Sequence, residues 1–360
     1  MQESFYLEYV SKYFPSLVLE VVEKLNEKRA SNALTYLYKD LLTPTYSMDS
    51  RWAGIIANYT RVAADIVSLD SELPLKSRDS IEVASGDIPK IGMKMYLTEK
   101  QMKDLDNMIA VGLPIGQIVQ VMFEDLPRCI EAVWERLEAT FLSELSTGVG
   151  VSEQNNGMGV RINCGYLEEN QKGVLTPWKG NSAALAIDDI EVIFDKALED
   201  QNTITDVWAD DFALRSLYAN EQVRQQFAFD MNFVGDKIPT LDFQKLQSVF
   251  LSRWGVTLHR VARKIKAESN GKKNNFTPWA EGVMVFTCDE RLGSLVWTNC
   301  AEVTRPVAGV TYQIADDFIL VSRYSTNDPL REFTSSQAMA VPVLNNVDRI
   351  YTLNSKKATA

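Results

Sequence analysis

The stretch REFTSSQAMAVPVLNNVDRI, residues 331–350, decides the fold expected for this chain of 360 residues. It is rich in small, aromatic and β-branched side chains and follows the turn residues Asn327-Asp328-Pro329. Such a run, bounded by turn residues, predicts a long strand near the end of the chain. Pro342 is expected near a sheet edge or a bulge, because proline cannot donate a hydrogen bond to a neighbouring strand.

A second informative stretch is VWERLEATFLSEL, residues 133–145. It lies in a region that predicts a long helix from about Ile115 to Ser146, which Pro127 should kink or interrupt. A helix of this length can act as the spine of a flat domain. Apolar side chains recur along it at helical spacing and are expected to face a core: Ile130, Trp134, Leu137, Phe141 and Leu145.

A shorter helix should precede this spine. Thr98-Glu99-Lys100-Gln101 matches a capping box, in which the first and fourth side chains satisfy each other's free backbone N–H groups. The helix is expected to run to about Val111, where Gly112-Leu113-Pro114 ends it.

Residues 49–97 combine apolar runs with a segment rich in charge, proline and small residues. Residues 52–67 could form a helix, and strand-like runs cover residues 66–69 and 90–97, the second with alternating apolar side chains. We interpret the region as a long two-stranded excursion with polar tips. An isolated hairpin is marginally stable, and ordering its backbone costs about 1–2 kcal/mol per residue, so a partner must supply contacts.

The flanking regions are less distinctive. Residues 1–48 are interpreted as an N-terminal arm with a helix over residues 16–28, whose stripe would be Leu17, Leu19, Val22 and Leu25. Residues 148–180 suggest loops with a tight turn at Asn156-Gly157. Residues 185–330 suggest mixed helices and strands: helices over 187–199, 210–220 and 240–250, and strands over 205–208, 256–265, 282–288 and 306–324.

Composition narrows the possible functions. The formal net charge is −11, which argues against a protein that reads nucleic-acid sequence through a basic surface but suits a wall that encloses a polyanion. The four cysteines form no metal-binding or redox spacing, and the single histidine, His259, removes most routes to a catalytic triad or metal site. No stretch approaches the roughly 20 apolar residues of a membrane span.

Charged clusters are interpreted as structural. The pairs Asp188-Asp189 and Asp210-Asp211 stand where helices should start, so we expect them to act as caps. The basic run over residues 260–266 is expected on a solvated sheet edge, which would also suit contact with an acidic neighbouring subunit. The sequence contains no phosphate-binding loop, dinucleotide fingerprint or nucleophile elbow.

The order of these features resembles the HK97-like capsid fold of tailed bacteriophages. Three runs carry the resemblance, which is to the phage lambda major head protein group: NDPLREFT followed by QAMAVPV at residues 327–343, VWERLEATFLSEL at 133–145, and Thr176-Pro177-Trp178 followed by Asp188-Asp189-Ile190. The resemblance covers roughly residues 50–350 and is weakest over the N-terminal arm.

The resemblance implies an α+β fold with four parts. These are an N-arm at residues 1–48, an E-loop hairpin at 49–97, a P-domain at 98–184 and 325–360 with the spine helix at about 115–146, and an A-domain at 185–324.

The resemblance also implies a structural function without enzymatic activity or cofactors. Copies of the chain would form pentamers and hexamers that tile an icosahedral shell around double-stranded DNA, bound without sequence specificity. Portal, scaffold and decoration proteins would be partners, and membranes would not. The chain would be made in the host bacterial cytoplasm and end in the virion.

The E-loop would contribute residues to contacts between subunits: Asp65, Glu72, Lys76, Arg78, Asp79, Lys90 and Lys94. Arg331, Glu332 and Phe333 are the residues expected to mark the terminal strand.

Two alternatives stay open at this point. An encapsulin-like nanocompartment would share the fold and enclose cargo proteins in place of DNA. An α+β enzyme would need a constellation of titratable groups in one pocket.

Overall fold

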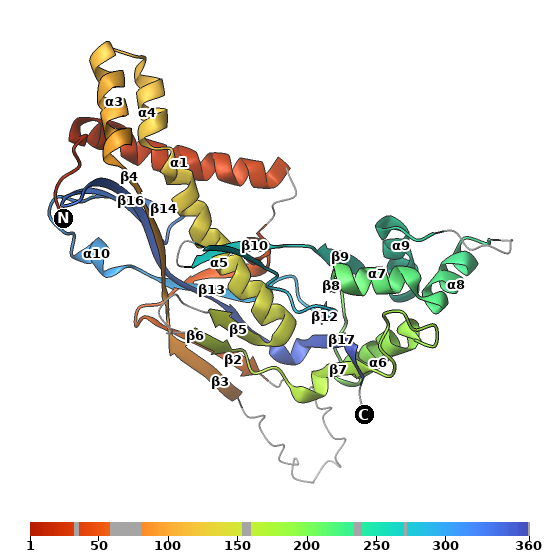
Figure 1. Ribbon diagram of the computed structural model, residues 1–360. Helices are drawn as coiled ribbons and strands as arrows, with labels where there is room; N and C mark the ends of the chain where they lie inside the picture. Colours follow the sequence, from red (N-terminus) through yellow and green to blue (C-terminus); the bar gives the residue numbers. More distant parts are fainter. Residues whose placement is uncertain (32–35, 58–80, 153–159, 234–239, 270–271, 359–360) are drawn as a thin grey trace, which may run out of the picture. The chain divides into compact units, whose positions relative to one another are not determined.

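The computed structural model describes residues 1–31, 36–57, 81–152, 160–233, 240–269 and 272–358 (Figure 1). The chain divides into two compact units, and each combines helices with sheets. The first unit contains Met1–Trp52, Gly86–Ala139 and Ser294–Pro342, and the second contains Ala53–Ser85, Thr140–Gly293 and Val343–Ala360.

A six-stranded sheet forms the centre of the first unit. Its strands follow the order β1 (Leu42–Tyr46), β13 (Gly293–Thr298), β16 (Leu330–Leu344), β15 (Ile319–Asn327) and β14 (Thr311–Ala315), and β4 (Lys90–Leu97) also pairs with β16. Strand β16 is antiparallel to both β15 and β4. The long strand predicted from residue 331 is therefore present, and Pro342 lies beyond the residues paired with β4 and β15.

The helices of the first unit are α1 (Leu7–Ser31), α2 (Leu37–Leu41), α3 (Glu99–Val111), α4 (Ile115–Met122) and α10 (Ala301–Thr304), with the first part of α5 (Asp125–Thr147). The capping box at Thr98 is confirmed, since Thr98 accepts from the Gln101 N–H and Gln101 accepts from the Thr98 N–H at 2.9 Å. Gly112 ends α3 with a φ of 74°, a left-handed conformation that favours glycine.

The predicted spine is two helices. The break falls at Phe123 and Glu124, between α4 and α5, while Pro127 lies in the first turn of α5, where its missing N–H has no helical partner to lose. The N-terminal helix is also longer than predicted. It begins at Leu7, and its buried stripe is Val10, Phe14, Val18 and Leu25, whereas Leu19 of the predicted stripe is exposed.

Strands β2 (Arg51–Ala57) and β3 (Ile81–Asp87) form a separate two-stranded sheet, here called the β2–β3 ribbon. The helix considered for residues 52–67 is therefore wrong over its first part. A side chain at Gly86 would overlap the indole of Trp52, so glycine lets the two segments approach closely. The predicted strand at 66–69 lies outside the described residues.

The second unit has a five-stranded sheet in the order β7 (Gln171–Val174), β17 (Ile350–Ala358), β12 (Val283–Thr287), β8 (Asp206–Asp210) and β9 (Thr257–Val261). Its helices are α6 (Ala186–Glu199), α7 (Asp211–Ala219), α8 (Glu221–Asp230) and α9 (Phe243–Trp254). Two small sheets complete it, β5 (Val149–Ser152) with β6 (Val160–Asn163), and β10 (Ile265–Ser269) with β11 (Lys272–Phe276). Helix α8 was not predicted.

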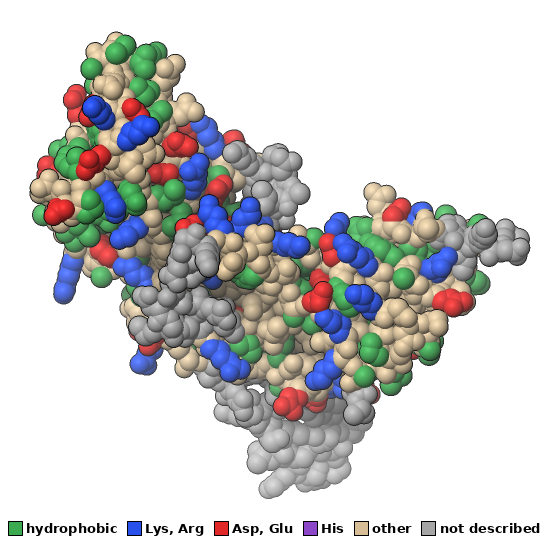
Figure 2. Space-filling view, in the orientation of Figure 1, with side chains coloured by type: hydrophobic (Ala, Val, Ile, Leu, Met, Phe, Trp, Pro, Cys, Tyr) green, Lys and Arg blue, Asp and Glu red, His purple; other side chains and the backbone are tan. Residues whose placement is uncertain are grey.

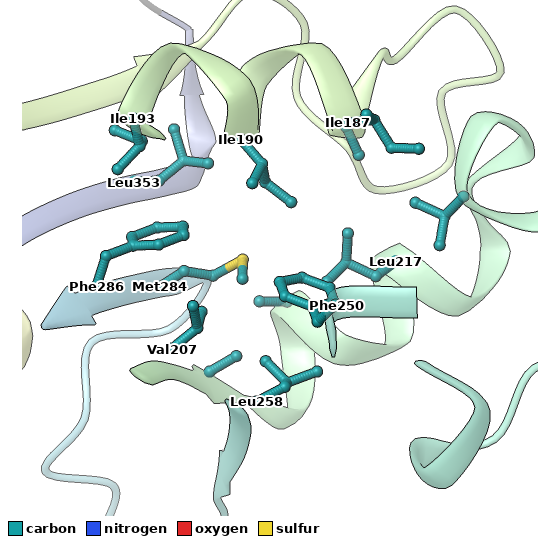
Figure 3. Close-up of a cluster of buried hydrophobic side chains, with 14 of the residues drawn as sticks. Ile187, Ile190, Ile193, Val207, Leu217, Phe250, Leu258, Met284, Phe286 and Leu353 are labelled. Atoms are coloured by element: carbon teal, nitrogen blue, oxygen red, sulfur yellow. The ribbon is translucent and has the colours of Figure 1, made fainter. Parts of the chain in front are cut away.

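One face of this sheet carries the core of the second unit (Figure 3). Ile190 and Ile193 of α6 point toward Met284 and Phe286 of β12, and Ile187 lies at the other end of the same helix. These five side chains are at most 3% exposed. Since burying such a side chain stabilises by about 1.5–3 kcal/mol, the cluster accounts for a large share of the stability of this unit.

Two features of the described structure lie at the predicted domain boundaries. The boundary at residue 324 falls inside β15, which pairs continuously with β16 from Ile319 to Asn327. The segment from Ile350, predicted to belong with the terminal strand, turns away after β16 and forms β17 beside β12. A one-turn 3₁₀ helix, Val347–Arg349, separates these two strands and buries Val347, and sequence pattern alone did not reveal it.

The acidic pairs have different roles. Asp210 caps α7 by accepting from the Ala213 N–H at 2.9 Å, as predicted. Asp189 does not cap α6; it is buried and accepts from the Trp178 indole at 2.7 Å. Asp316 and Asp317 form the turn between β14 and β15 with φ values of 49° and 63°. The predicted Asn156-Gly157 turn lies outside the described residues.

Glu144, in the last part of α5, is a buried carboxyl group in the second unit. Neither of its oxygens hydrogen bonds to any part of the chain that the structure describes. A side chain at Gly150 of β5 would collide with it, and Cys164 and Tyr166 are the titratable groups that face it. Burial raises the pKa of Glu144 well above its ordinary value of 4.5.

We expect the free energy of unfolding of Glu144→Gln to exceed that of the wild type by an amount that grows as the pH rises. Above about pH 4.5 the unfolded chain releases a proton that folded Glu144 retains, so the wild-type free energy of unfolding falls with rising pH. Denaturant titrations of both proteins should agree near about pH 4 and diverge by about pH 8. The exposed Glu168→Gln serves as control. A constant difference at all pH values would contradict this account.

Candidate assembly surfaces

The predicted terminal-strand residues lie on both faces of the first unit's sheet. Phe333 pairs with Tyr96 of β4 and Tyr324 of β15, with ring centroids 5.6 and 5.2 Å away. The guanidinium carbon of Arg331 lies 4.1 Å from the Tyr96 ring centroid. Phe333 and Tyr324 are buried, whereas Tyr96 is 42% exposed, so the Tyr96 ring beside Arg331 is the part of this row that offers a surface for cation–π and apolar contact.

Glu332 points to the opposite face, where it forms a buried ion pair with Arg323. The N–O distance is 3.1 Å, and the side chains are 0% and 1% exposed. Arg323 also donates at 2.9 Å to the Met122 carbonyl at the end of α4 and to the Thr334 hydroxyl. Glu332 accepts from the Ser4 hydroxyl and from the Phe5 N–H. Glu332 is thus buried within its own unit and is not exposed for contact with a neighbour.

The first residues of the chain are fixed by the same part of the sheet. Gln2 and Ser325 exchange two backbone hydrogen bonds of 3.0 and 3.1 Å, and the Ser325 hydroxyl donates to the Glu3 carbonyl. Tyr6 donates to Asp106 of α3 at 2.9 Å. Burial, and next the bond to Asp106, raise the pKa of Tyr6, so its hydroxyl remains a donor.

The predicted E-loop residues are only partly within the described structure. Asp65, Glu72, Lys76, Arg78 and Asp79 lie outside the described residues. Lys90 and Lys94 belong to β4 of the central sheet and not to the hairpin. Lys90 pairs with Glu302 at 3.0 Å, and Lys94 lies 5.6 Å from the Phe333 ring centroid. Residues 90–97 show the predicted alternation of side chains, but their partner is β16 and not a strand of the predicted hairpin. Only the tertiary structure decides this choice of partner.

The five spine residues, Ile130, Trp134, Leu137, Phe141 and Leu145, are all buried. Trp134 packs edge-on against Tyr36 at 5.5 Å, and the Lys39 ammonium lies 3.3 Å from its ring centroid. These side chains therefore stabilise the chain itself.

A surface that the sequence interpretation did not identify is the tip of α3 and α4. Val111 and Ile115 are 78% and 53% exposed, and apolar side chains gather there in Figure 2. Exposed apolar patches mark contact surfaces in soluble proteins. A signal was present, since no charged residue occurs between Asp106 and Glu124.

A pocket of about 270 Å³ in the first unit has a different character. Its lining includes Trp297, Phe318, Asp316, Asp317 and Lys39. The Lys39 ammonium and the Asp316 carboxylate form an ion pair of 2.8 Å, so each of these two charges is neutralised by the other within the pocket.

The single histidine lies in the second unit. His259 pairs with Asp206 at 2.7 Å and stacks on Trp208. Among described residues no group of three or more His, Cys, Asp or Glu could hold a metal ion.

No family model matches the chain, and no curated protein matches its sequence. Solved structures do match it. A candidate prophage capsid protein of Escherichia coli CFT073 superposes with a TM-score of 0.52 at 13% identity, covering 76% of this chain and 79% of that one. A phage-related protein from Bordetella bronchiseptica RB50 gives 0.50 at 11% identity, covering 96% and 98%. The chain has the HK97-like capsid fold.

The predicted fold class is thereby confirmed. The capsid subunit of cyanophage A-1(L) is more distant, with a TM-score of 0.46, 11% identity and coverage of 90% and 93%. Among the residues that the structure describes, no helix is both long and apolar enough to cross a membrane.

We expect Glu332→Ala to lower the free energy of unfolding by about 3–5 kcal/mol, because it leaves Arg323 buried without its counterion. Burial already lowers the pKa of Arg323. Chemical denaturation below the concentration at which subunits associate would measure this.

The double variant Arg323→Met with Glu332→Leu is the matched control and should be less damaging, because it buries no charge. A double variant no more stable than Glu332→Ala would contradict the assignment.

Proposed function

We propose that this chain is the major capsid protein of a tailed bacteriophage. Its copies would assemble as pentamers and hexamers into an icosahedral shell around double-stranded DNA. The observation that carries the proposal is the fold match to the phage-related protein, which extends over 96% of this chain and 98% of the other. The proposed role is structural and needs no enzyme activity or cofactor.

In this proposal the first unit serves as the P-domain, the second as the A-domain and the β2–β3 ribbon as the base of the E-loop. The surfaces described above support it. The β2–β3 ribbon is a two-stranded sheet of its own, and such a ribbon is marginal without a neighbour. The tip of α3 and α4 exposes apolar side chains that contact with another subunit would cover. The net charge of −11 suits a container for DNA.

The proposed partners are further copies of the chain, a portal, a scaffold and decoration proteins. The virion is the proposed location, after synthesis in the bacterial cytoplasm. DNA would be enclosed without sequence-specific contacts.

Co-expression with the scaffold and portal genes of its own genome, followed by electron microscopy, tests the proposal. We expect closed shells with pentamers and hexamers, and packaging of DNA when the terminase is added. A chain that stays monomeric under these conditions would overturn it. Shells that select a protein cargo and never package DNA would assign it to an encapsulin-like compartment.

We expect that replacing residues 58–80 by a short Gly-Ser linker leaves a folded chain that cannot close shells. The replacement keeps both strands of the β2–β3 ribbon and removes the segment that would reach a neighbour. Circular dichroism and negative-stain microscopy would measure folding and assembly. A scrambled segment of the same composition is the control for length, and normal shells from the linker variant would refute the E-loop assignment.

A further inference from the structure

The segment with residue numbers 263–276 belongs to the second unit and is here called the basic ribbon; the structure describes residues 263–269 and 272–276 of it. It contains β10 and β11, which pair with each other as an antiparallel sheet separate from the five-stranded sheet (Figure 1). Ile265 is 4% exposed and anchors the base, with its cross-strand partner Phe276 half-buried. Farther along, Lys266, Glu268 and Lys273 are exposed. Since isolated two-stranded sheets are marginally stable, the outer part of the ribbon lacks the support that a partner would give.

The net charge of the basic ribbon is positive, whereas the net charge of the whole chain is negative. The ribbon has five basic residues and one acidic residue, so the remainder of the chain is four charges more negative than the total of −11. Lys264, Lys266 and Lys273 make no ion pair with any residue that the structure describes. Arg260 of β9, which precedes the ribbon in the chain, differs from these lysines because it forms an ion pair of 2.6 Å with Asp211.

We propose that the basic ribbon binds an acidic surface of a second copy of this chain. The inference rests on the proposed self-assembly and specifies one of its contacts. Charge complementarity carries it, because oppositely charged surfaces speed association and select the partner, and the remainder of each copy is strongly acidic.

The arrangement of charges favours a protein surface over DNA. The register places Lys266, Glu268 and Lys273 on one face of the ribbon, because Glu268 lies opposite Lys273 and two residues from Lys266. Glu268 would repel a phosphate backbone, whereas a protein surface of mixed charge can satisfy both signs.

The test is the full-length double variant Lys266→Glu with Lys273→Glu, assembled with its scaffold. We expect the subunit concentration required for assembly to rise by about tenfold or more at low salt, with the difference shrinking as salt increases. The control is Lys100→Glu with Lys103→Glu, two exposed lysines of α3 that make the same charge change elsewhere. Circular dichroism checks that both variants fold.

Carbodiimide crosslinking of shells assembled from mixed isotope-labelled and unlabelled subunits identifies the partner. We expect mixed-label crosslinks from Lys266 or Lys273 to a carboxylate. Failure of the wild type to assemble would defeat the proposed function itself. Wild-type assembly with an unaffected ribbon variant would overturn only this inference. A defect that appears only when nucleic acid is present, and vanishes after nuclease treatment, would assign the ribbon to DNA and also overturn it.

Discussion

The buried ion pair between Arg323 and Glu332 is the constraint around which the first unit is arranged. Two charges removed from water cost more than their attraction returns unless every remaining donor and acceptor is well placed. Here most of these contacts come from separate parts of the chain, because Met122 ends α4, Thr334 lies in β16, and Ser4 and Phe5 precede α1. One nitrogen of Arg323, Nη2, is buried without a hydrogen-bond partner among the described residues. The pair therefore specifies where these segments meet, beyond any stability it adds.

This arrangement has a consequence for the N-terminus. Its backbone pairing with Ser325 and the two bonds to Glu332 hold the first residues against the sheet, although they precede the first helix. An N-terminal segment fixed in this way is part of the unit. The exposed side chains on the tip of α3 and α4, the Tyr96 ring and the basic ribbon are among the surfaces that the proposed self-assembly would use.

Closed symmetric assemblies repeat the same contacts many times. A small contact area at each surface is therefore enough for stable association when every copy presents several such surfaces. These exposed surfaces differ in chemistry: an apolar tip, the Tyr96 ring beside Arg331, and a basic ribbon. Chemically distinct surfaces help an acidic chain to associate in one register, because mismatched pairs of surfaces would leave apolar area exposed or charges unpaired.

The sequence by itself determined the local elements whose signals are short-range: the Thr98 capping box, the spine side chains, the Asp210 cap and the long strand from residue 331. Helix capping and periodicity depend on neighbours within a few residues, so they can be recognised without a fold. The tertiary structure decided the rest. It paired β4 with β16 and not with the hairpin, turned the chain at residues 347–349 so that β17 joins β12, and buried Glu332 against Arg323. Strand pairing and charge burial depend on residues far apart in the chain, so they become visible only when the whole chain has folded.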